Sequence, residues 1–310
     1  MYDVPEQAWD LVEGLAPAYG DDWWYAGMLA FMRQEQERWD EAAELSARAL
    51  AVEPSAGHAV HARAHVHFET GDHVNGLAWL DRWIMTSGPS AHHGAHFSWH
   101  AALHELALGD DAALRRRYDA QLAPPRVAGP RVLVDSASLL WRAHLEDVWD
   151  GPLPVTAVLD AAGPGLLDAP PSPFVALHAA VALAAADDAP GLERLQRYAA
   201  VDARPLLRTA IAPLARGLAA YVEGRFDDAA TILLPLGVPI SRVAGSAAQR
   251  EVVQDTLLHA LLNASRLEEA QVLLERRLDR RPSRRDLCQL ARIYAEPSGD
   301  ADRELIAAGV

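Results

Sequence analysis

The sequence predicts an all-α protein, a right-handed superhelix of about seven tetratricopeptide-like helix pairs. Three observations support this prediction. Apolar residues recur at three- and four-residue spacing along the chain of 310 residues, which is the period of helices that bury one face. The alternating patterns typical of strands are almost absent. Small residues, glycines and prolines also recur at intervals of about 34 to 41 residues, as in proteins built from stacked helix pairs.

The clearest repeat covers residues 57–89. In such a repeat, small residues let two antiparallel helices approach closely, glycine turns the chain between them, and proline ends the second helix. One pair cannot bury its apolar face alone, so neighbouring pairs are expected to stack. Within 57–89 the matching residues are Ala64, Gly71, Gly76 and Leu80. Similar units are predicted, in chain order, at residues 39–54, 105–124, 217–236 and 264–282.

The middle of the chain is less regular. Residues 123–173 are rich in proline and glycine, and we expect two irregularly joined helix pairs there, within a single solenoid that spans 1–310. The alternative is a hinge near 150–173 that separates two lobes. All nine tryptophans lie at or before Trp149, so the two halves are expected to differ in what they bury or bind.

The charge composition excludes several kinds of chemistry. The chain has 28 basic and 43 acidic residues, for a net charge of −15, and every basic residue is an arginine. Without lysine, neither a Schiff base to pyridoxal phosphate (PLP) nor a lysine-containing phosphate loop can form. A dinucleotide-binding glycine pattern is also lacking, so we expect no PLP and no nucleotide cofactor. Most of the negative charge lies in the first half, which argues against nucleic acid and anionic membranes as partners.

Compartment and assembly are predicted from simpler features. No apolar run reaches the roughly 18 residues that span a bilayer. The single Cys288 allows no disulfide within the chain, so a cytoplasmic protein is expected. The segment RRLDRRPSRR, residues 276–285, is strongly basic. It is interpreted either as a solvated helix end and turn or as a docking surface for the acidic half of a second copy, which would make a homodimer.

Four segments occur in a characteristic order: HAVHARAHVHFETGDHVNGLAWLDRW, HFSWHAALHELALGDDAALRRRYD, VDSASLLWR and AAQREVVQDTLLHALLNASRLEEAQVLLERRL. This ordered set resembles the tetratricopeptide-repeat-38-like family over roughly residues 20–285. The resemblance implies a tetratricopeptide-like fold and marks these motifs as candidate positions, with no settled activity to carry over. It also implies that this chain is N-terminally shortened, which would open one end of the groove or leave it to a partner.

Histidines are concentrated in one part of the chain. Ten of the thirteen lie between His58 and His104. When Ala64 takes position 8 of its repeat, His61, His65 and Glu69 take successive positions that face the concave groove of a tetratricopeptide unit. The three residues lie one helical turn apart from each other. This spacing predicts a row of polar side chains along one helix face.

The next groove-facing helix, counted from Gly109, carries His96, Trp99 and His100. His96 and His100 again lie one turn apart, and adjacent helices pack at about 10 Å. Four imidazoles and an indole are therefore predicted to converge on one surface. Most other histidines are expected at the rim or surface, namely His58, His67, His73, His92 and His93. Two are expected to pack in the interior, namely His104 and His178.

Such a cluster fits three uses, and the sequence leaves all three open. Pairs of histidines at i and i+4 can chelate a divalent transition metal, so the four histidines are candidate ligands and Glu69 is a candidate oxygen ligand. The same imidazoles can act as catalytic acids and bases without a metal, because imidazole titrates near neutral pH. Thirdly, the rings can simply pack between helices. For the first two uses, Trp99 would line the pocket with an apolar wall.

Further groove-facing candidates lie outside the histidine segments. Asp255 and His259 occupy the same repeat positions as the first histidine pair, and Gln249 and Arg250 precede them by about one turn. Arg250 is either a clamp for carboxylate or phosphate or a member of an ion pair. Asp135 either enters the groove or caps a helix.

The sequence thus supports two functions. The first is a helical-repeat protein whose histidine- and tryptophan-lined groove binds a small molecule or a peptide, which is the common use of such repeats. The second is an enzyme whose acid–base or metal-dependent chemistry takes place in the same groove. Neither the enzyme question nor the binding of a metal is decided by the sequence.

Overall fold

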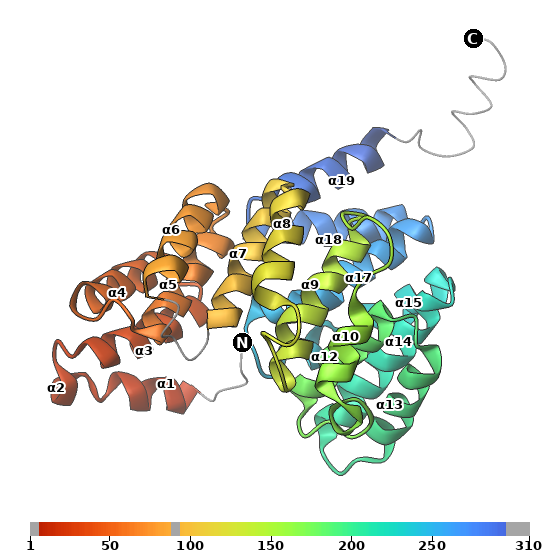
Figure 1. Cartoon of the computed structure of the whole chain (residues 1–310), viewed down its shortest axis with the longest axis horizontal. Helices are drawn as coiled ribbons and strands as arrows, with labels where there is room; N and C mark the ends of the chain where they lie inside the picture. Colours follow the sequence, from red (N-terminus) through yellow and green to blue (C-terminus); the bar gives the residue numbers. More distant parts are fainter. Residues whose placement is uncertain (1–5, 88–93, 296–310) are drawn as a thin grey trace, which may run out of the picture.

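The computed structural model describes residues 6–87 and 94–295, and in these ranges every regular element is a helix (Figure 1). The all-α prediction is confirmed for this part of the chain. Within the same ranges, no helix is both long and apolar enough to cross a membrane. His92 and His93 lie outside the described residues, so their expected place at the rim stays a prediction.

The first third of the chain is a row of helices whose successive members pack together. They are α1 (Glu6–Glu13), α2 (Ala16–Tyr19), α3 (Trp23–Glu35), α4 (Trp39–Val52), α5 (Gly57–Glu69), α6 (His73–Thr86), α7 (Gly94–Leu108) and α8 (Asp111–Arg117). α3 packs on both α4 and α5, and α5 packs on both α6 and α7. Small residues allow this close approach, because a β-carbon added at Gly76 of α6 would lie 2.7 Å from the ring of His104 on α7.

The remainder of the chain contains three π-helical segments among its α-helices. The central elements are η2 (Tyr118–Leu122), η3 (Val132–Ala137), α9 (Ser138–Leu145), α10 (Val155–Ala162), α11 (Pro164–Asp168) and α12 (Pro173–Ala185). The C-terminal elements are α13 (Ala189–Val201), η4 (Leu207–Ile211), α14 (Ala212–Val222), α15 (Phe226–Leu233), η5 (Leu234–Leu236), α16 (Gly237–Ser241), α17 (Ala247–Asn263), α18 (Leu267–Arg280) and α19 (Arg284–Ala295). Residues 123–173, predicted to be irregular, therefore hold η3, α9 and two short helices.

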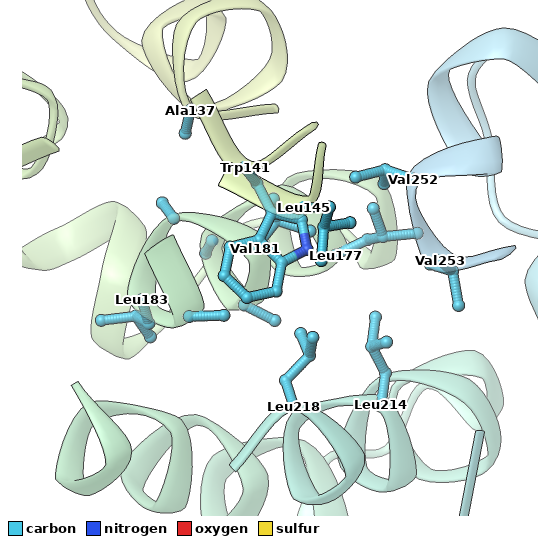
Figure 2. Packing of buried hydrophobic residues seen from close by; sticks show 14 of the residues in the cluster. Ala137, Trp141, Leu145, Leu177, Val181, Leu183, Leu214, Leu218, Val252 and Val253 are labelled. Carbon is cyan, nitrogen blue, oxygen red and sulfur yellow. The ribbon is translucent and has the colours of Figure 1, made fainter. Parts of the chain in front are cut away.

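One large apolar core extends across this irregular region. Trp141 of α9 lies in its middle, with Leu177 of α12 and Leu214 and Leu218 of α14 around its ring (Figure 2). The buried indole Nε1 of Trp141 donates to Thr256 Oγ1 of α17 at 2.8 Å. The apolar face of α9 and this hydrogen bond therefore tie the centre of the chain to the C-terminal helices.

The last helices pack back against the first ones. α19 contacts α7 and α17 contacts α9, so segments from both ends of the chain lie side by side (Figure 1). Arg281, just after α18, donates to Glu69 Oε2 of α5 at 3.2 Å and to Glu251 Oε1 of α17 at 2.6 Å. Arg280 Nη2 lies 2.9 Å from the same oxygen of Glu69. These bonds join the end of α5 to the end of α18.

A second set of buried ion pairs is centred on Asp255 of α17. Its carboxylate accepts from Arg142 Nε at 3.1 Å, from Arg277 Nη1 at 2.9 Å and from Arg285 Nη2 at 3.2 Å. Burial alone would raise the pKa of Asp255, but Arg277, Arg285 and Arg142 hold that pKa below its usual value. The carboxylate therefore stays ionised and binds three segments of the chain together.

Arginines of the segment at residues 276–285 form ion pairs with carboxylates of the same chain. Arg277 and Arg281 are both buried, with 7% of their surface exposed. The interpretation of a solvated helix end is wrong for these two residues, because their guanidinium groups are held by buried carboxylates. For the same reason they are not available to the acidic half of a second copy.

We expect Asp255→Ala to destabilise the fold by about 3–5 kcal/mol, because it leaves buried arginines without their counter-ion. Urea unfolding followed by tryptophan fluorescence measures the change. The matched control is Arg225→Ala, which removes an exposed ion-pair partner of Glu223 and Asp228 and should leave the unfolding midpoint close to that of the wild type. Equal midpoints for Asp255→Ala and the wild type would contradict this role of the network.

Candidate functional site

Four histidines from two neighbouring helices meet in the interior. His61 and His65 lie one turn apart on α5, and His96 and His100 lie one turn apart on α7. The ring centroid of His61 is 4.6 Å from that of His65, 4.9 Å from that of His96 and 5.0 Å from that of His100. His100 is also 4.7 Å from both His65 and His96. The structure thus brings together all four histidines that repeat counting singled out, hereafter the histidine cluster.

The ring nitrogens of the cluster point toward one another. His61 Nε2 lies 3.0 Å from His65 Nε2 and 3.1 Å from His96 Nε2. One ring nitrogen from each of His61, His65 and His100 also falls within 4.8 Å of the others. In a tetrahedral metal site with metal–nitrogen bonds of about 2.0–2.1 Å, the nitrogens are about 3.3 Å apart. The distances from His61 Nε2 to His65 Nε2 and His96 Nε2 are close to this value, and His61, His65 and His100 form a candidate ligand group for one metal ion.

Two members of the cluster differ in their remaining contacts. His96 Nδ1 lies 2.8 Å from Asp135 Oδ1, a carboxylate with no exposed surface on η3. This partner fixes the proton on Nδ1 and leaves the Nε2 lone pair for a ligand. By contrast, neither ring nitrogen of the buried His100 has a hydrogen-bond partner in the described part of the chain. An unpaired buried polar group is costly, so His100 is the member that a ligand would stabilise most.

Burial keeps His65 and His100 neutral. Desolvation is the main cause that lowers the pKa of His65 to about 3, and the charges of His96, Arg280 and Arg250 lower it further. Desolvation also holds the pKa of His100 well below its usual value, together with the neighbouring histidines. The neutral ring is the form that binds metals. It is a poor proton donor or acceptor near neutral pH when its pKa is this far from 7.

Aromatic side chains enclose the cluster. Trp99 stacks on His96 with ring centroids 5.4 Å apart and an interplanar angle of 10°. Phe31 of α3 lies 5.1 Å from His61. Trp99 is fully buried, so its ring supports the histidines from behind and does not line an open groove.

A cavity of about 430 Å³ lies between α3 and α5 on one side and α15, α17 and α18 on the other, and none of the four histidines is among its lining residues. Glu69 lines it one turn beyond His65, and Glu35 lines it one turn beyond Phe31. Arg250 and Arg280 also line it, and their charges reach His65. The cavity and the histidine cluster are therefore neighbouring parts of one region.

Glu69, expected as an oxygen ligand, forms ion pairs with Arg280 and Arg281 at the end of α18. Its Oε2 pairs with Arg280 and Arg281, while its buried Oε1 has no hydrogen-bond partner in the described ranges. Burial raises the pKa of Glu69, although Arg281 and Arg280 oppose the rise. Glu69 is thus a cavity residue next to the cluster and lies outside the group of ligand atoms that meet there.

The other predicted residues have different surroundings. Asp135 binds His96 and does not cap a helix, since it lies inside η3, so the helix-cap interpretation is wrong. Gln249 forms a capping box with Ser246 at the start of α17. Arg250 donates to the backbone carbonyls of Val243 and Gly245 and also lines the cavity.

Asp255 and His259 do not join the histidine cluster. Asp255 belongs to the buried ion pairs described above. His259 lies 3.5 Å from the hydroxyl of Tyr221, and burial lowers its pKa. Asp255 and His259 occupy the same repeat positions as His61 and His65, but they make structural contacts among the C-terminal helices.

A separate histidine pair lies near the cluster. His73 Nδ1 is 3.0 Å from His104 Nδ1, and His67 Nδ1 is 3.0 Å from Asp72 Oδ2. His104 is fully buried, as expected of a packing residue. Of the histidines expected at the rim within the described ranges, His58 is exposed, whereas His67 and His73 are half-buried. His178 is fully buried in α12, as expected of a core residue.

Sequence reasoning missed the cavity residues Glu35, Arg280 and Arg281. The arginine-rich segment was a signal for two of them, because an isolated basic stretch in an acidic chain needs an acidic partner. The partner was placed in a second copy, however, and the sequence offered no indication that α18 returns to α5.

Comparison with known families leaves the site to be interpreted from its geometry. No family model matches the chain. The resemblance to tetratricopeptide-repeat-38-like proteins therefore remains a proposal that rests on the quoted motifs.

We expect the metal-free protein to lose stability as the pH falls from about 6.5, the ordinary pKa of histidine. Burial lowers the pKa of His65, His104 and His178 to about 3 in the folded chain. Between these pH values the unfolded chain binds protons that the folded chain does not, so the free energy of unfolding falls by up to about 1.4 kcal/mol per pH unit for each histidine.

Urea unfolding between pH 7 and pH 5, with a chelator present, measures this slope. His178→Leu should make the slope smaller because it removes one of these groups, whereas His144→Gln, at an exposed position, should leave it unchanged. A free energy of unfolding that is constant over this range would contradict the expectation.

Proposed function

We propose that the protein is a metal-dependent protein that binds one divalent transition metal ion in the histidine cluster and a small molecule in the adjoining cavity. The observation that carries this proposal is the meeting of histidine nitrogens from two helices: His61 Nε2 lies 3.0 Å from His65 Nε2 and 3.1 Å from His96 Nε2, and one ring nitrogen from each of His61, His65 and His100 lies within 4.8 Å of the others. Imidazole ligands suit zinc, copper, nickel, cobalt and ferrous iron. The Asp135–His96 pair supports the proposal, because metal-binding histidines commonly donate their other ring nitrogen to a carboxylate.

Two other uses of the cluster are less well supported. Metal-free acid–base catalysis requires a group with a pKa near the working pH, whereas burial lowers the pKa of His65 to about 3. Packing alone would not require four ring systems to direct their nitrogens at each other. An isolated buried imidazole such as His178, which lies against Phe174, shows what a packing histidine looks like in this fold.

The cavity favours a small molecule over a peptide. Its volume of about 430 Å³ lies within the usual range of small-molecule sites, about 300–1,000 Å³. A ligand in this cavity would lie against Glu35 and Glu69, next to the helices that carry the cluster. A metal ion with one coordination position open to the bound molecule would act on it as a Lewis acid. The site would then be an enzyme centre.

We also propose that the scaffold is a right-handed superhelix of tetratricopeptide-like pairs, related to the tetratricopeptide-repeat-38-like family and located in the cytoplasm. The packing of α3 on α4 and α5, and of α5 on α6 and α7, supports the repeat. The single exposed Cys288 supports the compartment.

Elemental analysis of the purified protein tests the metal centre. We expect about one equivalent of a transition metal, either as isolated or after reconstitution, and its loss in His61→Ala and in His100→Ala. Circular dichroism and the unfolding midpoint establish whether each variant is folded. The control is His144→Ala, which should retain the metal because His144 is exposed and lies outside the cluster.

Two results would contradict the metal centre. One is a wild-type protein that takes up none of zinc, cobalt, nickel, copper or ferrous iron. The other is full metal content in folded His61→Ala and His100→Ala proteins. Cobalt substitution adds a readout of coordination number, since four-coordinate cobalt absorbs far more strongly in the visible range than six-coordinate cobalt.

Asp135→Asn should weaken metal binding by about 10- to 100-fold, because an amide holds the proton of His96 Nδ1 less strongly than a carboxylate does. Competition with a chromophoric chelator measures the affinity. Asp119→Asn, an exposed carboxylate on η2, is the matched control and should not change it. Wild-type affinity in a folded Asp135→Asn protein would show that Asp135 does not orient a ligand.

A further inference from the structure

Some of the charged side chains that line the cavity are held in ion pairs, and others keep free hydrogen-bond donors. Glu69 and Glu251 are both ion-paired with Arg281, and Glu269 is paired with Arg266. Each of these carboxylates therefore already has a positive partner. A ligand that enters the cavity meets acidic groups whose charge is largely compensated.

Two arginines of α18 keep donors available on the cavity side. Arg276 and Arg280 lie one turn apart and both line the cavity. Among the described residues, no ion pair or hydrogen bond engages Arg276. Arg280 pairs with Glu69 through Nη2 at 2.9 Å and with Glu37 through Nε at 4.0 Å, its Nη1 enters neither pair, and its side chain is still 32% exposed. Two neighbouring guanidinium groups with free N–H donors match the oxygens of a carboxylate or a phosphate.

Apolar side chains complete the lining. Leu233 of α15, Leu257 of α17 and Leu273 of α18 contribute to it. A ligand that fits both parts of the lining needs an oxyanion group and an apolar body. An inorganic anion alone would leave this apolar surface in contact with water.

We infer that the ligand of the cavity is a small organic anion, with a carboxylate or phosphate group bound by Arg276 and Arg280 and an apolar body against the leucines. The inference rests on the proposed function, which assigns a small molecule to this cavity. It adds the chemical class of that molecule. It also places the anionic group at α18, where Arg280 pairs with Glu69, and the apolar body against the leucines of α15, α17 and α18.

Calorimetric titration with three six-carbon probes tests this inference. Hexanoate and hexyl phosphate carry the two candidate anionic groups, and hexanamide has the same body as hexanoate without a charge. We expect at least one anion to bind and hexanamide to bind far more weakly. Arg276→Gln should weaken anion binding by about 10- to 100-fold, the factor expected from the loss of a hydrogen bond between charged groups.

The control variant is Arg292→Gln, which alters an exposed arginine of α19 outside the cavity and should bind the anions as the wild type does. Arg276 has no ion-pair partner in the described structure, so Arg276→Gln is expected to fold, and circular dichroism checks this. Arg280→Gln provides a second variant with the same expected direction.

Equal binding of hexanoate and hexanamide, or wild-type affinity in both arginine variants, would overturn the inference. Failure of the wild type to bind either anion would overturn it as well. Metal content is measured on the same samples, so a protein that keeps its metal and binds no anion refutes this inference and leaves the metal centre standing. Preference for hexanoate or for hexyl phosphate identifies the anionic group.

Discussion

A buried network of arginines and carboxylates holds the two ends of this chain together, and the candidate site depends on it. Asp255 alone binds Arg142, Arg277 and Arg285, which belong to segments far apart in the sequence. Each buried charge costs several kcal/mol unless it is matched by partners with good geometry. The network therefore permits only one placement of α18 against α9, and this placement brings the end of α18 to Glu69.

The histidine cluster on α5 and α7 is buried as well, but its electrostatics differ from those of the network. In the network, burial is tolerated because every charge has a partner. In the cluster, burial is tolerated by His65 and His100 because their rings are neutral, as their lowered pKa values indicate. Neutral imidazoles held on two packed helices offer lone pairs to a ligand. Asp135, behind His96, supplies one negative charge that partly compensates a divalent cation.

Local periodicity explains which parts of the site the sequence could predict. The i, i+4 spacing places His61 with His65 and His96 with His100, and the repeat register brings the two pairs onto adjacent helices. Both steps need only helix geometry and nearest-neighbour packing. The sequence identified Asp135 as a candidate but did not predict its contact with His96. That contact joins residues 39 positions apart through a π-helical segment. The segment that contains Arg281 was interpreted as a solvated helix end or as a docking surface, because its contact with Glu69 spans 212 positions and depends on the closure of the whole chain.

The two proposed ligands compensate each other's charge. Arg250 and Arg280 oppose positive charge at His65, as their effect on its pKa indicates, and the same field acts against a metal cation in the cluster. An organic anion bound to Arg280 cancels part of this field. It therefore strengthens the attraction between the imidazoles and the cation, and the cation in turn strengthens the binding of the anion, since coupling between two sites is reciprocal. A cavity rich in arginine beside a cluster of neutral histidines is thus consistent with a site that becomes complete when both ligands are present.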